Sequence, residues 1–407
     1  MGKPKIRFEG YSEDWEQRKL DDVLKRRIEQ RQQSEEYPRL AFASGQGVIP
    51  LSERKTNNRE QLTKDEYTKK YLVTELNDIV YNPANVKYGA IDRNKCGRGV
   101  ISPIYVTFTT NEVPGFIERI VTSHDFQQRA LRFEEGTVTK RQSVNPEDLV
   151  TLDILVAPKR EEQQKIATYF DALDHLITLH QRKYDETKTL KKYMLQKMFP
   201  QNGEKVPEIR FDGFTEDWEQ RKLGEVCEIK DSARIPNSEW SESGIPYIRA
   251  SDVTNENTDG VLFISQERYE FYKNRTGAPT KNDVLFNGGG EIGKSLLITD
   301  EKPIYVQGGA VLYARTSKSR ELVGQYLKTY FETTNAKSYI DAASAGGTMR
   351  HFTLKPSQKM RILMPSVEEQ EKIGGYFVNL DRLITLHQRK CDELRSVKKF
   401  MLQNMFI

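Results

Sequence analysis

Apolar residues recur at alternating steps of four and three along two segments of the chain, residues 158–199 and 365–406. Each segment opens with its only proline, followed by an acidic turn at Glu161–Glu162 or Glu368–Glu369, and carboxylates there complement a helix dipole. The spacing predicts two coiled-coil helices of about 40 residues, each roughly 60 Å long. The predicted seam residues are Ile166, Phe170, Leu173, Ile177 and His180 in the first helix and Ile373, Phe377, Leu380, Ile384 and His387 in the second.

Polar residues interrupt both seams at matching places, His180 and Lys191 in the first helix and His387 and Lys398 in the second. Such residues cost stability but fix the register of a coiled coil. If the two helices pair antiparallel, they form a stiff spacer with a globular part at each end. The alternative is two separate surface helices, each packed on its own domain.

The chain contains a twofold repeat of a large unit. Residues 4–23 and 207–226 are identical at 14 of 20 positions, at an offset of 203. The helical segments are identical at 27 of 42 positions, at an offset of 207. Matching ends around divergent middles of similar length suggest one scaffold that carries two different recognition domains.

The variable middles have mixed patterning. Residues 101–110 and 283–286 have the β-branched and aromatic character of strands, whereas residues 322–333 look helical. We therefore predict an α+β fold, with two globular domains separated by two long antiparallel coiled-coil helices in a pseudo-twofold repeat. The predicted boundaries are residues 1–157, 158–200, 201–362 and 363–407.

Two short segments of similar sequence, here called echoes, remain in the variable middles. NDIVYN at 77–82 parallels NDVLFN at 282–287, and GTVTKRQ at 136–142 parallels GTMRHFT at 347–353. Basic and aromatic residues gather near these echoes. Such side chains on glycine-containing loops reach phosphates and base edges, although any single one is more often a solvated surface charge. The candidate DNA-contact residues are Lys87, Tyr88, Arg93, Lys95, Arg98, Lys140, Arg141, Arg249, Lys281, Lys294, Ser295, Arg350 and His351.

Composition narrows the function only slightly. The net charge is +4, so the overall charge does not indicate nucleic-acid binding. Three scattered cysteines without a CxxC pair fit a reducing cytoplasm and no structural zinc, and the five histidines suggest no metal site. The absence of an apolar run of 18 residues predicts no membrane span, and the charged N-terminus does not resemble a secretory signal.

Two motifs suggest enzymes. Residues 288–295, GGGEIGKS, match a phosphate-binding P-loop, but the following residues look like a strand and not the required helix, so a hairpin loop is the favoured interpretation. Asn82–Pro83–Ala84–Asn85 is similar to the active-site motif of adenine methyltransferases, but it lacks the second proline and the aromatic residue. We therefore expect no catalytic residue in this chain.

The complete layout resembles the specificity subunit of a type I restriction–modification system. The resemblance rests on the PxxEEQxKI helix starts at 158–166 and 365–373, the LITLHQRK segments at 176–183 and 383–390, and DWEQRKL at 14–20 and 217–223. It also rests on DVLFNGGGEIGK at 283–294, which has no glycine-rich equivalent in the first half, where PANVKYGA stands instead.

The resemblance implies a function that the spacing alone does not. Each middle would recognise one half of a gapped double-stranded DNA target, and the helices would set the gap. Two methyltransferase subunits, which bind S-adenosylmethionine, would dock on the helices, and two restriction subunits that use ATP and magnesium would join them. Catalysis and cofactors would therefore lie in these partners, and Gln163, Tyr169 and Leu176 are candidates for partner contact.

Two other functions remain open at this stage. One is a P-loop nucleotidase that uses Lys294 and Ser295, and the other is a coiled-coil adaptor that does not bind DNA. ATP binding by the isolated chain would favour the first. The absence of any salt-dependent affinity for DNA would favour the second.

Overall fold

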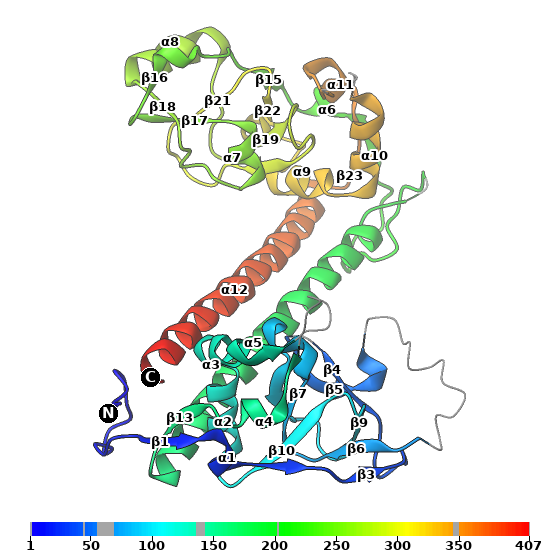
Figure 1. The fold of residues 1–407 in the computed structure, drawn as a ribbon. Helices are drawn as coiled ribbons and strands as arrows, with labels where there is room; N and C mark the ends of the chain where they lie inside the picture. Colours follow the sequence, from blue (N-terminus) through cyan, green and yellow to red (C-terminus); the bar gives the residue numbers. More distant parts are fainter. Residues whose placement is uncertain are drawn as a thin grey trace. The chain divides into compact units, whose positions relative to one another are not determined.

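The computed structural model describes residues 2–43, 45–54, 69–135, 143–201, 203–344 and 350–406. The chain divides into two compact units. Unit 1 contains residues 1–180 and 389–407, and unit 2 contains residues 181–388. Each unit therefore combines a globular domain, the first part of the helix that follows it and the last part of the helix that follows the other domain (Figure 1).

The strands and helices of unit 1 precede and include the start of the first long helix. They are β1 (Glu16–Lys19), α1 (Leu20–Val23), β2 (Leu24–Arg27), β3 (Gln30–Arg31), β4 (Leu40–Ala43), β5 (Gly47–Pro50), η1 (Leu51–Glu53), β6 (Tyr71–Thr74), β7 (Ile79–Tyr81), η3 (Pro83–Tyr88), β8 (Ile91–Arg93), β9 (Gly99–Ile101), β10 (Val106–Thr110), α2 (Pro114–Val121), α3 (His124–Ala130), η4 (Leu131–Phe133), β11 (Glu134–Glu135), β12 (Ser143–Val144), α4 (Pro146–Leu149), β13 (Asp153–Val156) and α5 (Arg160–Lys197).

The elements of unit 2 lie between the two long helices and include the start of the second. They are β14 (Glu219–Lys222), α6 (Leu223–Val226), β15 (Ile229–Asp231), η5 (Asn237–Glu239), β16 (Trp240–Ser241), β17 (Ile245–Ile248), α7 (Ala250–Thr254), β18 (Phe263–Ile264), α8 (Gln266–Thr276), β19 (Val284–Asn287), β20 (Ser295–Leu297), β21 (Tyr305–Val306), β22 (Val311–Ala314), η6 (Thr316–Lys318), α9 (Gly324–Phe331), α10 (Thr334–Ala343), α11 (Leu354–Lys359), β23 (Arg361–Met364) and α12 (Val367–Met405).

The two units share a sheet of the same topology. Four antiparallel strands have the order β2-β10-β7-β8 in unit 1 and β15-β22-β19-β20 in unit 2, and the ribbons β1-β13 and β14-β23 also correspond. The echo between residues 77–82 and 282–287 therefore marks equivalent strands, β7 and β19. Beyond this sheet the units differ: unit 1 adds β3-β6-β9 and the hairpin β4-β5, whereas unit 2 adds β16-β18-β17-β21 and α8.

The repeated sequence at the helix starts builds the same two anchors in each unit. The buried carboxylate of Glu162 accepts two hydrogen bonds from Arg7, and Glu369 accepts two from Arg210. The repeated IRF and EEQ motifs thus have a direct structural role, because the ion pair between them joins the N-terminal segment of each unit to its own long helix.

The glutamine of each EEQ motif ties the helix to the globular domain. The Oε1 atom of Gln163 accepts a hydrogen bond of 3.0 Å from the amide of Val113, the residue just before α2. Gln370 makes the same 3.0 Å contact with the amide of Val323 at the start of α9. Gln163 is 1% exposed, so the prediction that it faces a partner protein is wrong.

Inside unit 1 the two helix segments run antiparallel. Phe170 packs against Phe406, the Lys398 ammonium contacts the Asp174 carboxylate at 2.5 Å, and the Cys391 thiol lies 3.7 Å from the Ile177 carbonyl. Residue numbers thus rise along α5 as they fall along α12. All ten seam positions named from the sequence are buried or half-buried, and both seam lysines are ion-paired.

Unit 2 repeats this arrangement with the helices exchanged. Phe199, near the end of α5, packs against Phe377 of α12, and Lys191 contacts Asp381 at 2.6 Å. An equivalent hydrogen bond joins the N-terminal segment of each unit to a helix end. The Ile209 amide donates to the Lys197 carbonyl in unit 2, and the Ile6 amide donates to the Asn404 carbonyl in unit 1. Each domain is thus completed by the end of the other domain's helix.

Candidate nucleic-acid interface

The glycine-rich loop of unit 2 connects the antiparallel strands β19 and β20. The amides of Gly288 and Gly289 both donate to the Ala310 carbonyl, at 2.9 and 3.2 Å, and the Phe352 amide donates to the Gly288 carbonyl. A Cβ atom on Gly288 would lie 2.7 Å from the Phe352 carbonyl oxygen, so this close approach requires glycine. The loop therefore brings together three segments that are distant in the sequence.

The hairpin geometry also differs from that of a P-loop, in which a helix follows the glycine-rich loop. Ser295 begins strand β20, whereas a P-loop requires a helix at that point whose N-terminus receives the phosphates. The Ser295 hydroxyl lies 3.4 Å from the Lys328 carbonyl, and Lys294 contacts Glu291 at 3.9 Å. Both residues line a cavity of about 450 Å³.

Several candidate residues of unit 2 lie around this loop. His351 is exposed, and its ring would lie 3.4 Å from a Cβ atom on Gly289. Arg249 precedes α7 and contacts Asp252 at 3.2 Å, while the next residue, Ala250, accepts a hydrogen bond from Asn287 at the end of β19. Arg249, the glycines and His351 therefore form one cluster.

Two candidates of unit 2 are placed differently. Arg350 is partly exposed and forms an ion pair with Asp341 of α10, at 3.7 Å. Lys281 precedes β19, at the end of the strand away from the glycine loop, and forms an ion pair with Glu301 at 3.2 Å. The structure does not bring Lys281 to the glycine-loop cluster.

Unit 1 has η3 where unit 2 has the glycine loop. Lys87 and Tyr88 lie in η3, between β7 and β8, and the Tyr88 side chain is 65% exposed. Arg98 is paired with Glu36 at 2.8 Å. Lys140 and Arg141 lie outside the described residues. The two units thus present different side chains from the same place in the shared sheet.

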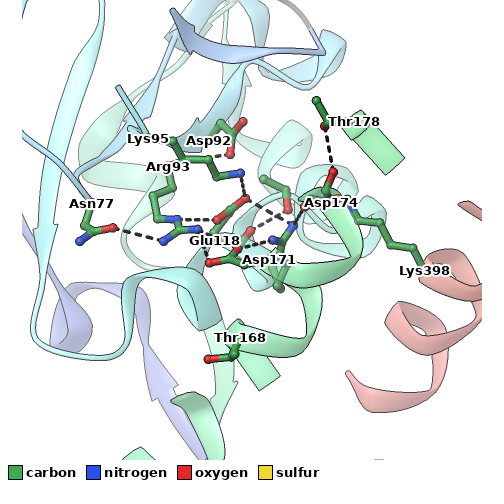
Figure 2. A network of polar contacts seen from close by, with 12 residues as sticks. Asn77, Asp92, Arg93, Lys95, Glu118, Thr168, Asp171, Asp174, Thr178 and Lys398 are labelled. Atoms are coloured by element: carbon green, nitrogen blue, oxygen red, sulfur yellow. Dashed lines mark hydrogen bonds and ion pairs between the residues drawn. The ribbon is translucent and has the colours of Figure 1, made fainter. Parts of the chain in front are cut away.

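Arg93 occupies an internal position and not an open surface. Its guanidinium contacts Glu118 at 2.6 Å and Asp171 of α5 at 2.8 Å, and the side chain is only 13% exposed (Figure 2). Burial disfavours the cation, but Glu118 and Asp171 outweigh this effect and raise the pKa of Arg93. Lys95 reaches the same Glu118 at 2.6 Å. Arg93 therefore holds the domain to the helix, and we do not include it in the interface.

The same network continues to the second helix. Arg119 forms ion pairs with both Asp171 and Asp174. Asp174 also forms an ion pair with Lys398 of α12 (Figure 2). Asp92 lies beside this network, where burial in the first place and Glu118 in the second raise its pKa to about 6. The charges in this region therefore position the domain on the helices and are not free for a ligand.

The long helices also carry exposed apolar side chains outside the predicted seam, and of these the sequence analysis names only Leu176, as a candidate for partner contact. Besides Val378 of unit 2, which is 38% exposed and has no apolar equivalent in unit 1, each unit has four of them, two from α5 and two from α12, and these eight are 40% to 56% exposed. They occupy equivalent positions at the offset of 207, which is the signal by which the sequence could have revealed them. They are Leu176, Leu179, Val397 and Phe400 in unit 1, and Leu190, Tyr193, Leu383 and Leu386 in unit 2.

No helix of the described residues is long and apolar enough to cross a membrane. Within the same residues, no three His, Cys, Asp or Glu side chains are grouped as metal ligands.

Comparison with known proteins gives consistent results. Residues 215–396 match the sequence model of the type I restriction modification DNA specificity domain. The specificity subunit of the type I restriction enzyme MjaVIII from Methanocaldococcus jannaschii is 22% identical over 254 residues, which cover 60% of this chain and 58% of that protein. The MjaIX specificity subunit of the same organism is 24% identical over 207 residues, 47% of this chain and 44% of that protein.

The chain thus spans about half the length of these relatives. A solved structure, the type I restriction–modification S subunit from M. genitalium, superposes with a TM-score of 0.63 and 15% identity over 99% of both chains. This similarity shows the fold alone, because the identity is low. It agrees with the α+β architecture and the two long helices described above.

Proposed function

We propose that the whole chain is the DNA specificity subunit of a type I restriction–modification complex, a proposal that starts from the match of residues 215–396 to the sequence model of the type I restriction modification DNA specificity domain. The observation that carries the proposal is the repeated sheet with a different loop at the same place in each unit. One scaffold with two unlike recognition surfaces suits a bipartite, gapped DNA target, one half per unit. The long helices then set the gap.

Basic and polar residues around the two loops support contact with DNA. In unit 2 Arg249, Lys294 and His351 lie around the glycine loop, where the exposed Gly290 lets a phosphate approach the backbone closely. In unit 1 Lys87 and Tyr88 occupy the equivalent loop, and Lys95 and Arg98 follow on the next turn. Arg98 and Lys294 pair with the exposed carboxylates of Glu36 and Glu291, and such pairs contribute little free energy, so they are compatible with exchange for phosphate. Lys95 pairs with the buried Glu118 and stays part of the internal network.

The exposed apolar side chains on the helices support a scaffold role. Monomeric proteins seldom leave several large apolar side chains exposed on one element without a partner. Since each unit has an equivalent set of four, the chain can hold two copies of one partner, which we propose is the methyltransferase subunit. That partner would supply S-adenosylmethionine chemistry. Two restriction subunits would supply chemistry that depends on ATP and magnesium.

Methylation mapping tests recognition directly. The chain is co-expressed with the methyltransferase subunit of its system, and methyladenine is located across the host genome by single-molecule sequencing. We expect one gapped motif that changes in one half only when residues 24–150 are exchanged for those of another specificity subunit. A stable complex with an active methyltransferase but no motif would refute sequence recognition and favour the adaptor function.

Introduction of a charge into the exposed apolar sets on the helices tests the scaffold role. We expect Leu179→Glu or Leu386→Glu, equivalent positions in units 1 and 2, to reduce the bound methyltransferase from two copies to one, measured by native mass spectrometry. The double variant should bind none, and Gln196→Glu, an exposed polar position on α5, should bind two. Retention of two copies by the double variant would contradict the assignment of the docking surface.

A further inference from the structure

Unit 1 contains a cavity of about 750 Å³ beside the loop that we assign to DNA contact. The hairpin β4-β5, the start of η3 and the turn before β10 enclose it. Its described lining includes Phe42, Gln46, Asn85, Tyr88, Ile104 and Tyr105. Neither the sequence patterns nor the comparisons with known proteins single out this cavity.

The walls of the cavity are fixed by the fold. The rings of Phe42 and Tyr105 stack with their centroids 6.2 Å apart and an angle of 28° between their planes. The hairpin turn needs Gly47, which has a φ of +72° and whose Cβ atom would lie 2.2 Å from a carboxylate oxygen of Asp92 on β8. The hairpin is therefore held against the central sheet, and the cavity is a built feature.

The polar groups of the cavity differ in their availability. The Asn82 side chain accepts a hydrogen bond of 3.1 Å from the Ala84 amide and caps η3, so its role is structural. Asn85 and Gln46 are exposed, and their side chains make no hydrogen bond within the described part of the chain. Two amide groups thus line the cavity without a hydrogen-bond partner among the described residues.

The apolar groups of the rim are exposed as well. The Ile104 side chain is 60% exposed and that of Tyr88 is 65% exposed, although both line the cavity. Arg54 is the one charged residue of the described lining. A cavity with so little charge does not suit phosphate, which needs several cations or amides. It suits the edge of a base pair, which offers neutral hydrogen-bonding groups and, in thymine, a methyl group.

We propose that this cavity reads an A·T base pair in the half-site of unit 1. Asn85 and Gln46 bond to the adenine edge, because an amide side chain matches the adenine N6 and N7 atoms in the major groove. Ile104 and Tyr88 pack against the thymine methyl group. The inference rests on the proposed function, since it assigns a base to a surface already proposed to contact DNA.

The first experiment uses the complex of the full chain with its methyltransferase subunit, in the methylation mapping described above. We expect Asn85→Ala with Gln46→Ala to relax one A·T position in the half-site assigned to unit 1 and to leave the other half-site unchanged. The unchanged half-site shows that the variant folds and assembles. Gln17→Ala, an exposed amide on β1, should leave the whole motif unchanged.

The second experiment tests the methyl contact. A duplex with the mapped motif is compared with one in which uracil replaces the single thymine of that position, which removes only the methyl group. We expect the wild-type complex to bind the uracil duplex more weakly, and Ile104→Ala to bind both duplexes equally.

In the same binding assay, loss of the adenine contacts in the Asn85→Ala and Gln46→Ala variant should weaken binding roughly 5- to 150-fold, the range of one good bidentate contact.

The outcomes separate this inference from the function on which it rests. If the wild-type complex yields no motif, the proposed function fails and the cavity has no base to read. If the wild type yields a motif that the Asn85 and Gln46 variant leaves unchanged, or if uracil has no effect on the wild type, the base-reading cavity is refuted while the function stands.

Discussion

Replacement of Glu162 by glutamine tests whether the buried ion pair at the start of α5 holds unit 1 together. The Glu162 side chain is 0% exposed, and its two oxygens lie 2.5 and 2.8 Å from the Arg7 guanidinium, which is 12% exposed. The Trp15 indole nitrogen lies 3.5 Å from the same carboxylate. The substitution keeps the shape of the side chain but leaves the cation without its counter-charge.

The expected magnitude follows from this burial. Exposed ion pairs contribute about 0 to 1 kcal/mol, whereas removal of one partner of a buried pair costs about 3 to 5 kcal/mol. Since Arg7 retains a little contact with solvent, we expect Glu162→Gln to lower the free energy of unfolding of unit 1 by about 3 kcal/mol. With a urea dependence of about 2 to 3 kcal/mol per molar, the midpoint should fall by roughly 1 M.

The assay must report the two units separately, because a chain with two units need not unfold in one step. Pulsed hydrogen exchange with mass spectrometry along a urea series follows peptides of β1 and β13 for unit 1 and of β14 and β23 for unit 2. Glu161→Gln, the exposed neighbour, is the matched control and should cost at most about 1 kcal/mol. An equal effect of the two substitutions would refute the argument from burial.

Three further predictions follow from single residues. Asp92 has a pKa of about 6, so its protonated form stabilises unit 1 fully below about pH 4, and this contribution is lost as the pH rises through about 6. Asp92→Asn should therefore raise the free energy of unfolding by about 2 to 3 kcal/mol at pH 7.5 and by less at pH 5, as measured by urea denaturation. Gly375→Ala should stabilise α12 by up to about 1 kcal/mol, because a Cβ atom there meets nothing within 4 Å. Gly374→Ala should destabilise α12, because its Cβ atom would come within 2.8 Å of a side-chain carbon of α9. Shifts of the melting temperature in the same direction for both variants would contradict this prediction. Phe199→Ala removes a fully buried ring and should cost about 3 to 5 kcal/mol, against less than about 0.5 kcal/mol for the exposed Phe400→Ala.

The repeat and the long helices could be predicted from the sequence because their signal is periodic and strong. Apolar spacing identifies the seam without knowledge of the partner, and proline and acidic residues mark the helix starts. The echo at 77–82 and 282–287 also located equivalent strands correctly, since buried strands retain their apolar character when loops change. The strand-like character after Gly293 was enough to favour a hairpin over a P-loop.

Individual contacts could not be predicted, because they depend on which distant segments meet. Arg93 has the same local character as Lys95 or Arg98, yet the fold turns it towards Asp171 on a helix 78 residues away. Gln163 looks like a surface helix residue but becomes the acceptor for the start of α2. The aromatic cavity of unit 1 was missed for the same reason, since Phe42, Asn85 and Ile104 come from three separate loops or strands.

The contact of the Ile6 amide with the Asn404 carbonyl has a consequence for how the gene could be rearranged. In unit 2 the equivalent contact, between Ile209 and Lys197, is bridged by a continuous backbone of about ten residues, whereas in unit 1 the two sides belong to opposite ends of the described chain. The order of the domains and helices along the chain can therefore be permuted cyclically. A reading frame opened within residues 200–208 and closed by a short linker between residues 406 and 4 would encode the same contacts in a different linear order.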